Sequence, residues 1–458
     1  MKIKLLFISS LILTACLYSC SQDDSPNVPA GGDTGAPTYM DLSFTFPKSN
    51  TPKVRVTRAA TTGDNNASLL ETAINTVDIY IFNPNTGIMM KHDALTVNDF
   101  VQLASTANED VWKAKATIST TTGQKTVFVG VNLPASLSSE LEGNTLTAFN
   151  DKAYSLGLED LVTDKGIAMF SSNGVTSELK PVGDPAFNAN NNIKIPIKRL
   201  VTKVTVEESK DMKVNGPGSL TDLRFAINNI NRKLYLVPKA DGSDPNYQAN
   251  SWIQADFFDA KNIPGQTTDG YKPVNAANVN DVSILNSLYT TENTSVNHWK
   301  EEITRATVRA RFVPDNILQR NGNGFQQVSN KGKNPVTFWT VLLQNGYKEY
   351  FIDETAADAY ESANPGSIKS SPYTDGYCYY DLFLNKEGNF NGTNVSSKRW
   401  DVFRNDYYRC RITSILAPGR PNPGVVDPKV PPAVETDLQI EIDILFWNLV
   451  TSDYSLEP

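Results

Sequence analysis

Residues able to do acid–base or metal chemistry are scarce in this chain of 458 residues. It has two histidines, His92 and His298, which leaves little for metal binding or general-base catalysis. His298 stands near Glu301 and Glu302, but no motif places a partner carboxylate beside them. The net charge of −8 argues against a nucleic-acid partner, which would favour a basic face. The sequence therefore predicts no enzyme activity, no metal and no cofactor.

The cysteines near the start of the chain suit covalent attachment of a lipid. Residues 1–20 carry two lysines, then an apolar run and small residues, which is typical of a secretory signal peptide. The stretch LYSC ending at Cys20 resembles a bacterial lipobox, in which the cysteine is acylated after cleavage. LTAC ending at Cys16 fits the same pattern, and we favour Cys20 because the acidic SQDDS follows it. The following segment, rich in Gly, Pro, Asp and Ser, is typical of a flexible tether.

Two arginines, Arg55 and Arg58, follow the first strand-like segment and are candidate sites of proteolysis. Small and polar residues beginning with Ala59 come directly after Arg58, which favours cleavage there over Arg55. Taken alone, both arginines are better explained as solvated charges at the end of a strand.

Two further cysteines, Cys378 and Cys410, lie on strand-like segments late in the chain. An exported protein is permitted a disulfide, and two buried thiols explain the same pattern, so both interpretations stay open. Tyrosines flank both cysteines, at positions 377, 379, 380, 407 and 408. They would suit a glycan-stacking surface, but packing in the core and across strands explains them better.

Short alternating segments dominate the rest of the chain. The segment VDIYIFNPNTG alternates apolar and polar residues and ends in a turn signal, and similar segments recur. One short helix is expected from Asp353 to Ser362, with Asp353 or Thr355 as its cap. Many short strands between turns are typical of β-sandwiches. We therefore expect an all-β protein of two tandem sandwiches with long loops, divided into residues 59–200 and 201–458, with the helix in the second.

Strong strand patterns stand at both ends of the chain. Near the start, apolar residues alternate with polar ones at Met40, Leu42, Phe44 and Phe46. Near the end, directly before Trp447, a series with the same period comprises Leu438, Ile440, Ile442, Ile444 and Phe446. A Pro-rich stretch precedes it, which suits an arm that reaches out of its own domain. The pattern also fits a strand that completes its own sandwich, and both interpretations stay open.

Several of these pieces together resemble the type V pilins, or fimbrillins, of Bacteroidetes-type bacteria. The resemblance rests on the lipobox, on VTRAA after the first strand, and on VDIYIFNPNTG and IPIKRLVTKVTV. The strongest piece is CYYDLFL followed by FRNDYYRCRITSILAPG. Within it, Arg404 to Tyr408 resembles the family's R-N-x-Y-Y signature. The family usually has a proline before the tryptophan of its closing strand, where this chain has Phe446.

The resemblance implies two stacked transthyretin-like β-sandwiches in an exported lipoprotein. An Arg-specific protease would cut at Arg58, so that Ala59 begins the mature subunit and residues 21–58, the tether and the first strand, are removed. The strand from Met40 to Phe46 would leave a groove. The donor region, Leu438 to Leu456 of a neighbouring copy or related subunit, would fill that groove and build a head-to-tail polymer.

The resemblance thus predicts a structural subunit that passes through the outer membrane to a cell-surface fimbrium and supports adhesion to a host or bacterial surface ligand. The alternative is a lipid-anchored surface protein that binds glycan. The N-terminus of the protein recovered from the cell surface distinguishes the two. Ala59 is expected there for the pilin, whereas acylated Cys20 is expected for the anchored binder or for an anchor subunit of the fimbria.

Overall fold

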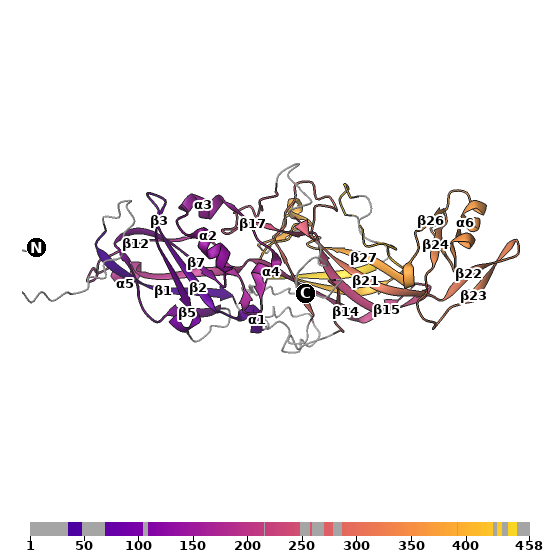
Figure 1. Ribbon diagram of the computed structural model, residues 1–458, viewed down its shortest axis with the longest axis horizontal. Coiled ribbons are helices and arrows are strands. Elements are labelled where there is room, and N and C mark those ends of the chain that lie inside the picture. Colours follow the sequence, from indigo (N-terminus) through magenta and orange to yellow (C-terminus); the bar gives the residue numbers. More distant parts are fainter. Residues whose placement is uncertain are drawn as a thin grey trace, which may run out of the picture.

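Strands make up most of the regular secondary structure of the described residues, and the long axis runs from one sheet at the N-terminal end to a small sheet at the other (Figure 1). The computed structural model describes residues 35–47, 69–103, 109–214, 216–247, 257–258, 270–277, 286–391, 393–424, 428–432 and 438–446. Strand content dominates because apolar and polar residues alternate along most segments, so that each strand buries one face. The all-β fold expected from the sequence is confirmed.

The N-terminal half is built around a ten-stranded sheet in which β1, the first strand described, has an interior place. Its main path is β3-β2-β7-β11-β13-β1-β5-β4, and β12 pairs with β7 and β6 with β1. The bounds are β1 Pro37–Pro47, β2 Thr76–Asn83, β3 Ile88–Thr96, β4 Phe100–Gln102, β5 Glu109–Ala114, β6 Ile118–Thr121, β7 Gly123–Val131, β11 Met169–Ser171, β12 Val175–Leu179 and β13 Asn192–Arg199. The short helices α1 Leu69–Thr72, α2 Ala135–Leu141, α3 Leu146–Asp151, α4 Leu158–Leu161 and α5 Phe187–Asn190 lie between these strands in the chain.

The C-terminal half begins with β14, two residues after β13 ends, and contains two four-stranded sheets. One has the order β20-β14-β30-β31, with β20 Ser287–Thr291, β14 Val201–Val214, β30 Asp406–Ile415 and β31 Leu438–Phe446. The other has the order β19-β15-β21-β27, with β19 Lys272–Pro273, β15 Gly218–Asn228, β21 Arg305–Pro314 and β27 Tyr377–Phe383. Buried side chains from both sheets belong to one hydrophobic cluster, as expected for a sandwich.

A smaller sheet stands at the far end of the C-terminal half (Figure 1). Its order is β23-β22-β25-β24-β26, with β22 Asn316–Asn321, β23 Gly324–Ser329, β24 Trp339–Leu342, β25 Lys348–Phe351 and β26 Ile368–Lys369. Helix α6, Glu354–Ala363, packs on it, and the Asp353 side chain caps the helix by accepting from the Ala356 N–H. The helix expected from Asp353 to Ser362 is therefore confirmed, with Asp353 as its cap.

Short two-stranded pairings complete the described structure. They join β9 Val162–Thr163 with β10 Gly166–Ile167, β16 Ile230–Asn231 with β18 Phe257–Phe258, and β28 Asn389–Phe390 with β29 Thr393–Asn394. The fourth pairs β8 Ala153–Ser155 with β17 Lys233–Tyr235 and so connects the two halves of the chain. Among the described residues, none of the helices combines the length and the apolar character needed to cross a bilayer.

Candidate functional site

Strand β1 lies between partners on both of its sides. It pairs in parallel with β13, from Asp41 opposite Asn192 to Thr45 opposite Pro196. On its other side it pairs antiparallel with β5 and, through residues 37–40, with β6. Strand β1 therefore has an interior position in its sheet and not an edge position. We call the space between β13 on one side and β5 and β6 on the other the β1 groove. Emptying it would expose two strand edges instead of one.

One face of β1 is completely buried in a hydrophobic cluster of the N-terminal half. Met40, Leu42 and Phe44 have 0% of their surface exposed and Phe46 has 2%. Phe44 packs edge-to-face against Phe100 with ring centroids 5.3 Å apart. Each such side chain stabilises the folded chain by roughly 1.5–3 kcal/mol through burial. The four expected residues therefore form the face of the strand that holds it in the sheet.

Asn191 binds the backbone at the start of β1. Its amide Nδ2 donates to the carbonyl of Tyr39 at 2.7 Å and to that of Lys180 at 3.1 Å. The main-chain carbonyl of Asn191 accepts from the Asp41 N–H at 2.8 Å. Asn191 is almost fully buried. A strand in the β1 groove must therefore supply a carbonyl and an N–H at the places of the Tyr39 carbonyl and the Asp41 N–H. An unsatisfied buried amide would cost about 1–3 kcal/mol.

A buried ionic network lies at the other end of β1, where the two halves of the chain meet. Glu71 of α1 accepts from Lys203 Nζ on β14 and from the Tyr289 hydroxyl on β20, both at 2.7 Å. The Arg199 guanidinium donates to the Glu71 carbonyl at 3.1 and 2.9 Å, and its Cζ lies 5.8 Å from the centre of the Phe46 ring. Burial lowers the pKa of Arg199 to about 10 and lowers the pKa of Lys203.

The sequence analysis missed this network. The available signal was a pair of cations, Arg199 and Lys203, inside the apolar segment IPIKRLVTKVTV. Buried cations need partners, but nothing in the sequence pointed to Glu71, more than 100 positions earlier.

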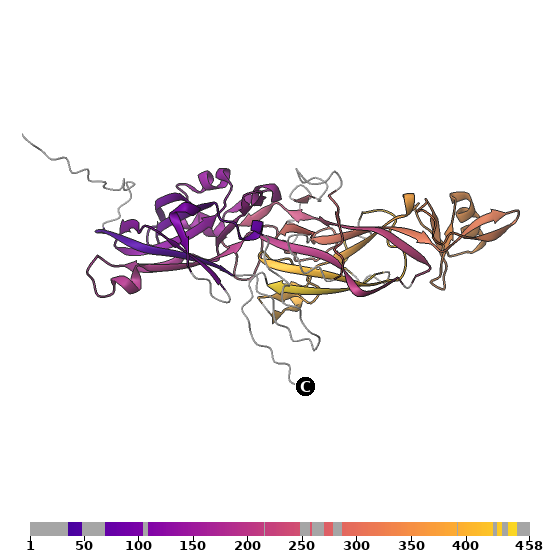
Figure 2. The ribbon, with the colours of Figure 1, turned by 90° about the horizontal axis from the view of Figure 1, so that it is seen from below.

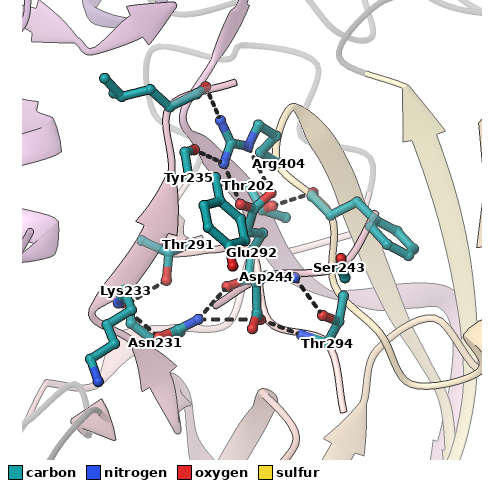
Figure 3. Close-up of polar contacts among 12 residues, drawn as sticks. Thr202, Asn231, Lys233, Tyr235, Ser243, Asp244, Thr291, Glu292, Thr294 and Arg404 are labelled. Atoms are coloured by element: carbon teal, nitrogen blue, oxygen red, sulfur yellow. Dashed lines mark hydrogen bonds and ion pairs between the residues drawn. The ribbon is translucent and has the colours of Figure 1, made fainter. Parts of the chain in front are cut away.

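The R-N-x-Y-Y signature begins with a buried arginine that holds three segments together (Figure 3). Arg404 Nε donates to Glu292 Oε2 at 2.7 Å and Nη1 donates to the Leu236 carbonyl at 2.8 Å, while Nη2 contacts Glu292 and the Tyr235 carbonyl. Nearby, Asp244 accepts from the Thr294 N–H at 2.6 Å. Burial raises the pKa of Asp244 to about 8. These contacts, buried as they are, give the arginine a structural role.

The remaining signature residues connect β30 to the junction between the halves. Asn405 has a positive φ of 65°, which asparagine tolerates better than most residues. Its Oδ1 accepts from the Arg199 N–H at 3.2 Å. The Tyr407 hydroxyl lies 3.0 Å from Thr205 Oγ1, and Tyr408 is fully buried. Burial raises the pKa of Asp406 to about 8. These tyrosines belong to the core, as the packing interpretation expected.

Strand β31 lies at the edge of its own sheet, as Figure 2 shows in yellow. It pairs antiparallel with β30, from Asp406 opposite Phe446 to Ile415 opposite Leu438. In the described part of the chain, β30 is its one strand neighbour. The C-terminal strand thus completes its own sheet in this single chain, which was one of the two open interpretations. Donation to a neighbouring chain remains a proposal, and Trp447 lies outside the described residues.

The residues expected to be processed are also outside the described part. Cys16 and Cys20 precede residue 35, and Arg55, Arg58 and Ala59 fall within residues 48–68. Their positions in the chain still matter, because residues 48–68 are the covalent connection between β1 and everything that follows it.

Of the two interpretations of Cys378 and Cys410, the disulfide is not present in the structure. Both residues are buried thiols in the core of the C-terminal sandwich. Cys378 lies on β27 and Cys410 on β30, and these strands belong to different sheets. The Cys378 thiol lies 3.6 Å from the Ala310 carbonyl and 3.6 Å from the Tyr380 hydroxyl. The alternative of two buried thiols is the one that holds.

The histidines have structural partners. His92 Nε2 lies 2.9 Å from Asp78, and His298 Nε2 lies 3.2 Å from Asp401. His298 therefore pairs with a residue that the sequence analysis had not considered. Over the part of the chain that the structure describes, no group of three or more His, Cys, Asp and Glu residues is arranged to hold a metal ion.

Three solved structures are similar to this chain over most of its length. A candidate cell adhesion protein from Parabacteroides distasonis has a TM-score of 0.49 and 15% identity, covering 90% of this chain and 100% of that chain. A fimbrilin from Porphyromonas gingivalis has a TM-score of 0.45 and 15% identity, covering 89% and 98%. The tip fimbrial protein Mfa3 from Porphyromonas gingivalis, with C-terminal truncation, has a TM-score of 0.39 and 12% identity, covering 89% and 100%. No curated protein matches the chain in sequence.

Family models match both halves of the chain. The model of the major fimbrial subunit protein (FimA) matches residues 40–222, so it includes the buried face of β1 and the junction at Arg199. The model of the major fimbrial subunit protein type IV, fimbrillin, C-terminal, matches residues 371–453, including the signature and β31. Together they match more than half of the chain. These are families of structural subunits, in agreement with the prediction that this protein is not an enzyme. The chain therefore belongs to the fimbrillin family of major fimbrial subunit proteins.

Proposed function

We propose that this protein is a fimbrial subunit that polymerises by strand exchange after proteolysis. In this proposal an arginine-specific protease cuts after Arg58, β1 leaves its groove, and the C-terminal strand of a neighbouring subunit enters it. The observation that carries the proposal is the placement of β1. Its apolar face is buried and it is paired on both sides, yet its covalent connection to the following fold is the single segment 48–68. One cut in that segment leaves the strand held by non-covalent contacts alone.

The energetics favour refilling an emptied groove. Four apolar side chains contribute roughly 1.5–3 kcal/mol each by burial, and each ladder hydrogen bond contributes roughly 0.5–1.5 kcal/mol. Among the described strands, β31 has one neighbour in its own sheet, whereas a strand in the β1 groove has neighbours on both sides. Exchange therefore replaces one ladder by two, and this gain offsets part of the entropy lost when an arm is ordered.

The positions of donor and acceptor lead to a filament. The acceptor groove belongs to the N-terminal half and the donor strand to the C-terminal half (Figure 2). A contact between two different surfaces does not close on itself in a pair, so its repetition extends head-to-tail. The proposal includes the division into a removed segment, residues 21–58, and two domains, residues 59–200 and 201–458. It is supported by the start of β14 at Val201 directly after the end of β13 at Arg199.

The proposal also includes delivery to the cell surface as a lipoprotein acylated at Cys20. It is supported by the lipobox-like stretch and the acidic residues after it. Adhesion would then be a property of the assembled fimbrium, with the ligand supplied by a host or bacterial surface.

Mutation of the two arginines tests the processing step. Arg58→Ala should leave a full-length lipoprotein and abolish filaments, whereas the matched control Arg55→Ala should be trimmed and assemble normally. Intact mass of surface material and electron microscopy give the two readouts. Normal filaments from Arg58→Ala would refute cleavage at that site.

Deletion of residues 438–458 tests the donor step. The shortened subunit should be exported and trimmed but remain unassembled. Long filaments from this variant would mean that the donor lies elsewhere in the chain.

A further inference from the structure

We propose that the guest strand occupies the β1 groove in one register and one direction. This inference rests on the strand exchange proposed above, and it specifies how the two chains recognise each other. The guest runs in the same direction as β1. We call the position that each residue of β1 holds in the groove its seat. In order, the seats of Met40, Leu42, Phe44 and Phe46 are taken by Ile440, Ile442, Ile444 and Phe446 of the neighbouring subunit.

The last seat favours an aromatic residue. Phe46 is 2% exposed and its ring lies beside the fully buried Arg199 guanidinium, an arrangement in which the π face of a ring interacts with the cation. In the proposed register Phe446 takes this seat. Within the described strand β31 it is the one aromatic residue. Placing the neighbouring Trp447 there instead would bring Glu441 and Asp443 into the apolar seats, because a one-residue slip turns every side chain to the other face.

The polar face of the groove is basic. Ser43 lies opposite Lys113 on β5 and opposite Lys194 on β13, and residues directly opposite in a sheet project from the same face. Lys113 Nζ also lies 3.5 Å from Asp41. In the proposed register Glu441 takes the seat of Asp41 and Asp443 takes the seat of Ser43. The guest therefore restores one acidic group and adds a second between two lysines.

The third polar-face seat differs from the other two. Thr45 is 4% exposed, and the residues opposite it are Val111 and Pro196. Neither of these can neutralise a charge, and a buried unpaired carboxylate is strongly unfavourable. In the proposed register Leu445 takes this seat, so each of the three seats receives a residue of suitable chemistry.

Three alternatives each place a residue badly. A shift of two positions that brings Leu438 to the first seat puts Asp443 into the Thr45 seat. A strand reversed over residues 440–446 puts Glu441 there. The opposite shift puts Leu445 between the two lysines and Asn448 into the apolar seat of Phe46. Charge and burial in the groove thus exclude these three arrangements.

The direction is also set by Asn191. The side-chain amide of Asn191 donates to the carbonyl of Tyr39, and its main-chain carbonyl accepts from the Asp41 N–H. A guest parallel to β13 presents a carbonyl and an N–H at the same two places, through Gln439 and Glu441. An antiparallel guest would shift these groups along the strand.

Cross-linking between two variants tests the register. Purified full-length chain carrying Lys113→Cys serves as acceptor, and Glu441→Cys, Asp443→Cys, Leu445→Cys or Val450→Cys serves as donor in separate preparations. After mixing, an arginine-specific protease removes residues 1–58 together with Cys16 and Cys20, and mild oxidation follows. Cα atoms of directly opposite residues lie within the 4.4–6.8 Å that a disulfide requires. Covalent dimers are separated from monomers on a non-reducing gel.

Asp443→Cys should give the dominant covalent dimer with the Lys113→Cys acceptor. With this acceptor, dominant dimers from any of the other three donors would overturn the register while leaving strand exchange intact.

Because a strand reversed over the same residues would also bring Asp443 opposite Lys113, a Val111→Cys acceptor, which lies opposite Thr45, tests the direction. Leu445→Cys should dominate with that acceptor, and dominance of Glu441→Cys would overturn the proposed direction. Trimmed wild-type chain, without oxidation, is examined in parallel by size-exclusion chromatography. If neither this chain nor any donor–acceptor mixture assembles, strand exchange is refuted, and the proposed register is refuted with it.

A charge variant provides a second measurement that needs no disulfide. Lys113→Gln with Lys194→Gln should weaken association of trimmed subunits by about three- to tenfold at low salt, as two exposed ion pairs would, and high salt should abolish the difference. The matched control Lys152→Gln changes a lysine directly after α3 that pairs with Glu140, outside the groove, and should leave association unchanged. Equal association of the double variant and wild type at low salt would contradict the proposed acidic–basic pairing.

Discussion

Phe44→Ala should weaken the hold of the precursor on β1 and leave the trimmed subunit untouched. Phe44 has none of its surface exposed and packs against Phe100 inside the cluster that lines the β1 groove. Truncation of a buried phenylalanine costs about 3–5 kcal/mol, because apolar burial is lost and a cavity remains. The free energy of unfolding of the N-terminal half of the uncut chain should fall by that amount.

The same loss should speed the release of the cut strand. Once Arg58 is cleaved, β1 is held only by its contacts, and 1.4 kcal/mol corresponds to a factor of ten in affinity. Retention of the fragment ending at Arg58 should therefore fall by roughly two to three orders of magnitude. Filaments formed from Phe44→Ala should match wild-type filaments, since the altered residue has departed with the fragment.

Urea denaturation of the uncut chain measures the first effect, and size-exclusion chromatography with mass spectrometry of the cut chain measures the second. Val101→Ala is a matched control, because Val101 lies in β4 of the same sheet and is 42% exposed. Its effect should stay within about 0.5 kcal/mol. A second control, Phe128→Ala, removes a buried ring from β7 and should weaken the uncut and trimmed chains alike. The reasoning is refuted if Phe44→Ala costs less than about 1 kcal/mol or leaves fragment retention unchanged.

Three further predictions concern the junction and the core of the C-terminal half. Lys203→Met should lower the free energy of unfolding by about 3–5 kcal/mol, because the buried Glu71 carboxylate then loses its bond to the Lys203 ammonium. Adding Glu71→Gln to Lys203→Met should recover part of this loss in urea titrations. Burial raises the pKa of Asp406 to about 8, well above its value of about 3.9 in an unfolded chain. The folded state then binds a proton that the unfolded state has lost, so the free energy of unfolding should fall as the pH rises from about 4 to about 8, and Asp406→Asn should flatten this dependence; an unchanged slope would contradict the assignment. Alkylation in denaturant without a reductant should modify both Cys378 and Cys410, and blocked residues would indicate a disulfide after all.

The alternating pattern was sufficient to predict the strands because burial of one face of a sheet is a local property of period two. Met40 to Phe46 illustrates this, since each of its four apolar residues is buried as expected. The cap of α6 at Asp353 was equally local. The identity of strand neighbours was not predictable in this way, because pairing joins residues that the sequence places far apart. The interior position of β1 and the partner of His298 therefore emerged only from the fold.

The sequence alone determined that this is an all-β protein of the fimbrillin type, with a strand pattern at each end and arginines after the first. Tertiary structure decided what those two strands are in a single chain. It put β1 between β13 and β5, and it put β31 at an edge. It also brought Glu71, Arg199 and Lys203 together at the junction. The physical reason is that apolar periodicity specifies which face of a strand is buried, whereas hydrogen-bond partners and compensating charges are set by contacts between distant segments.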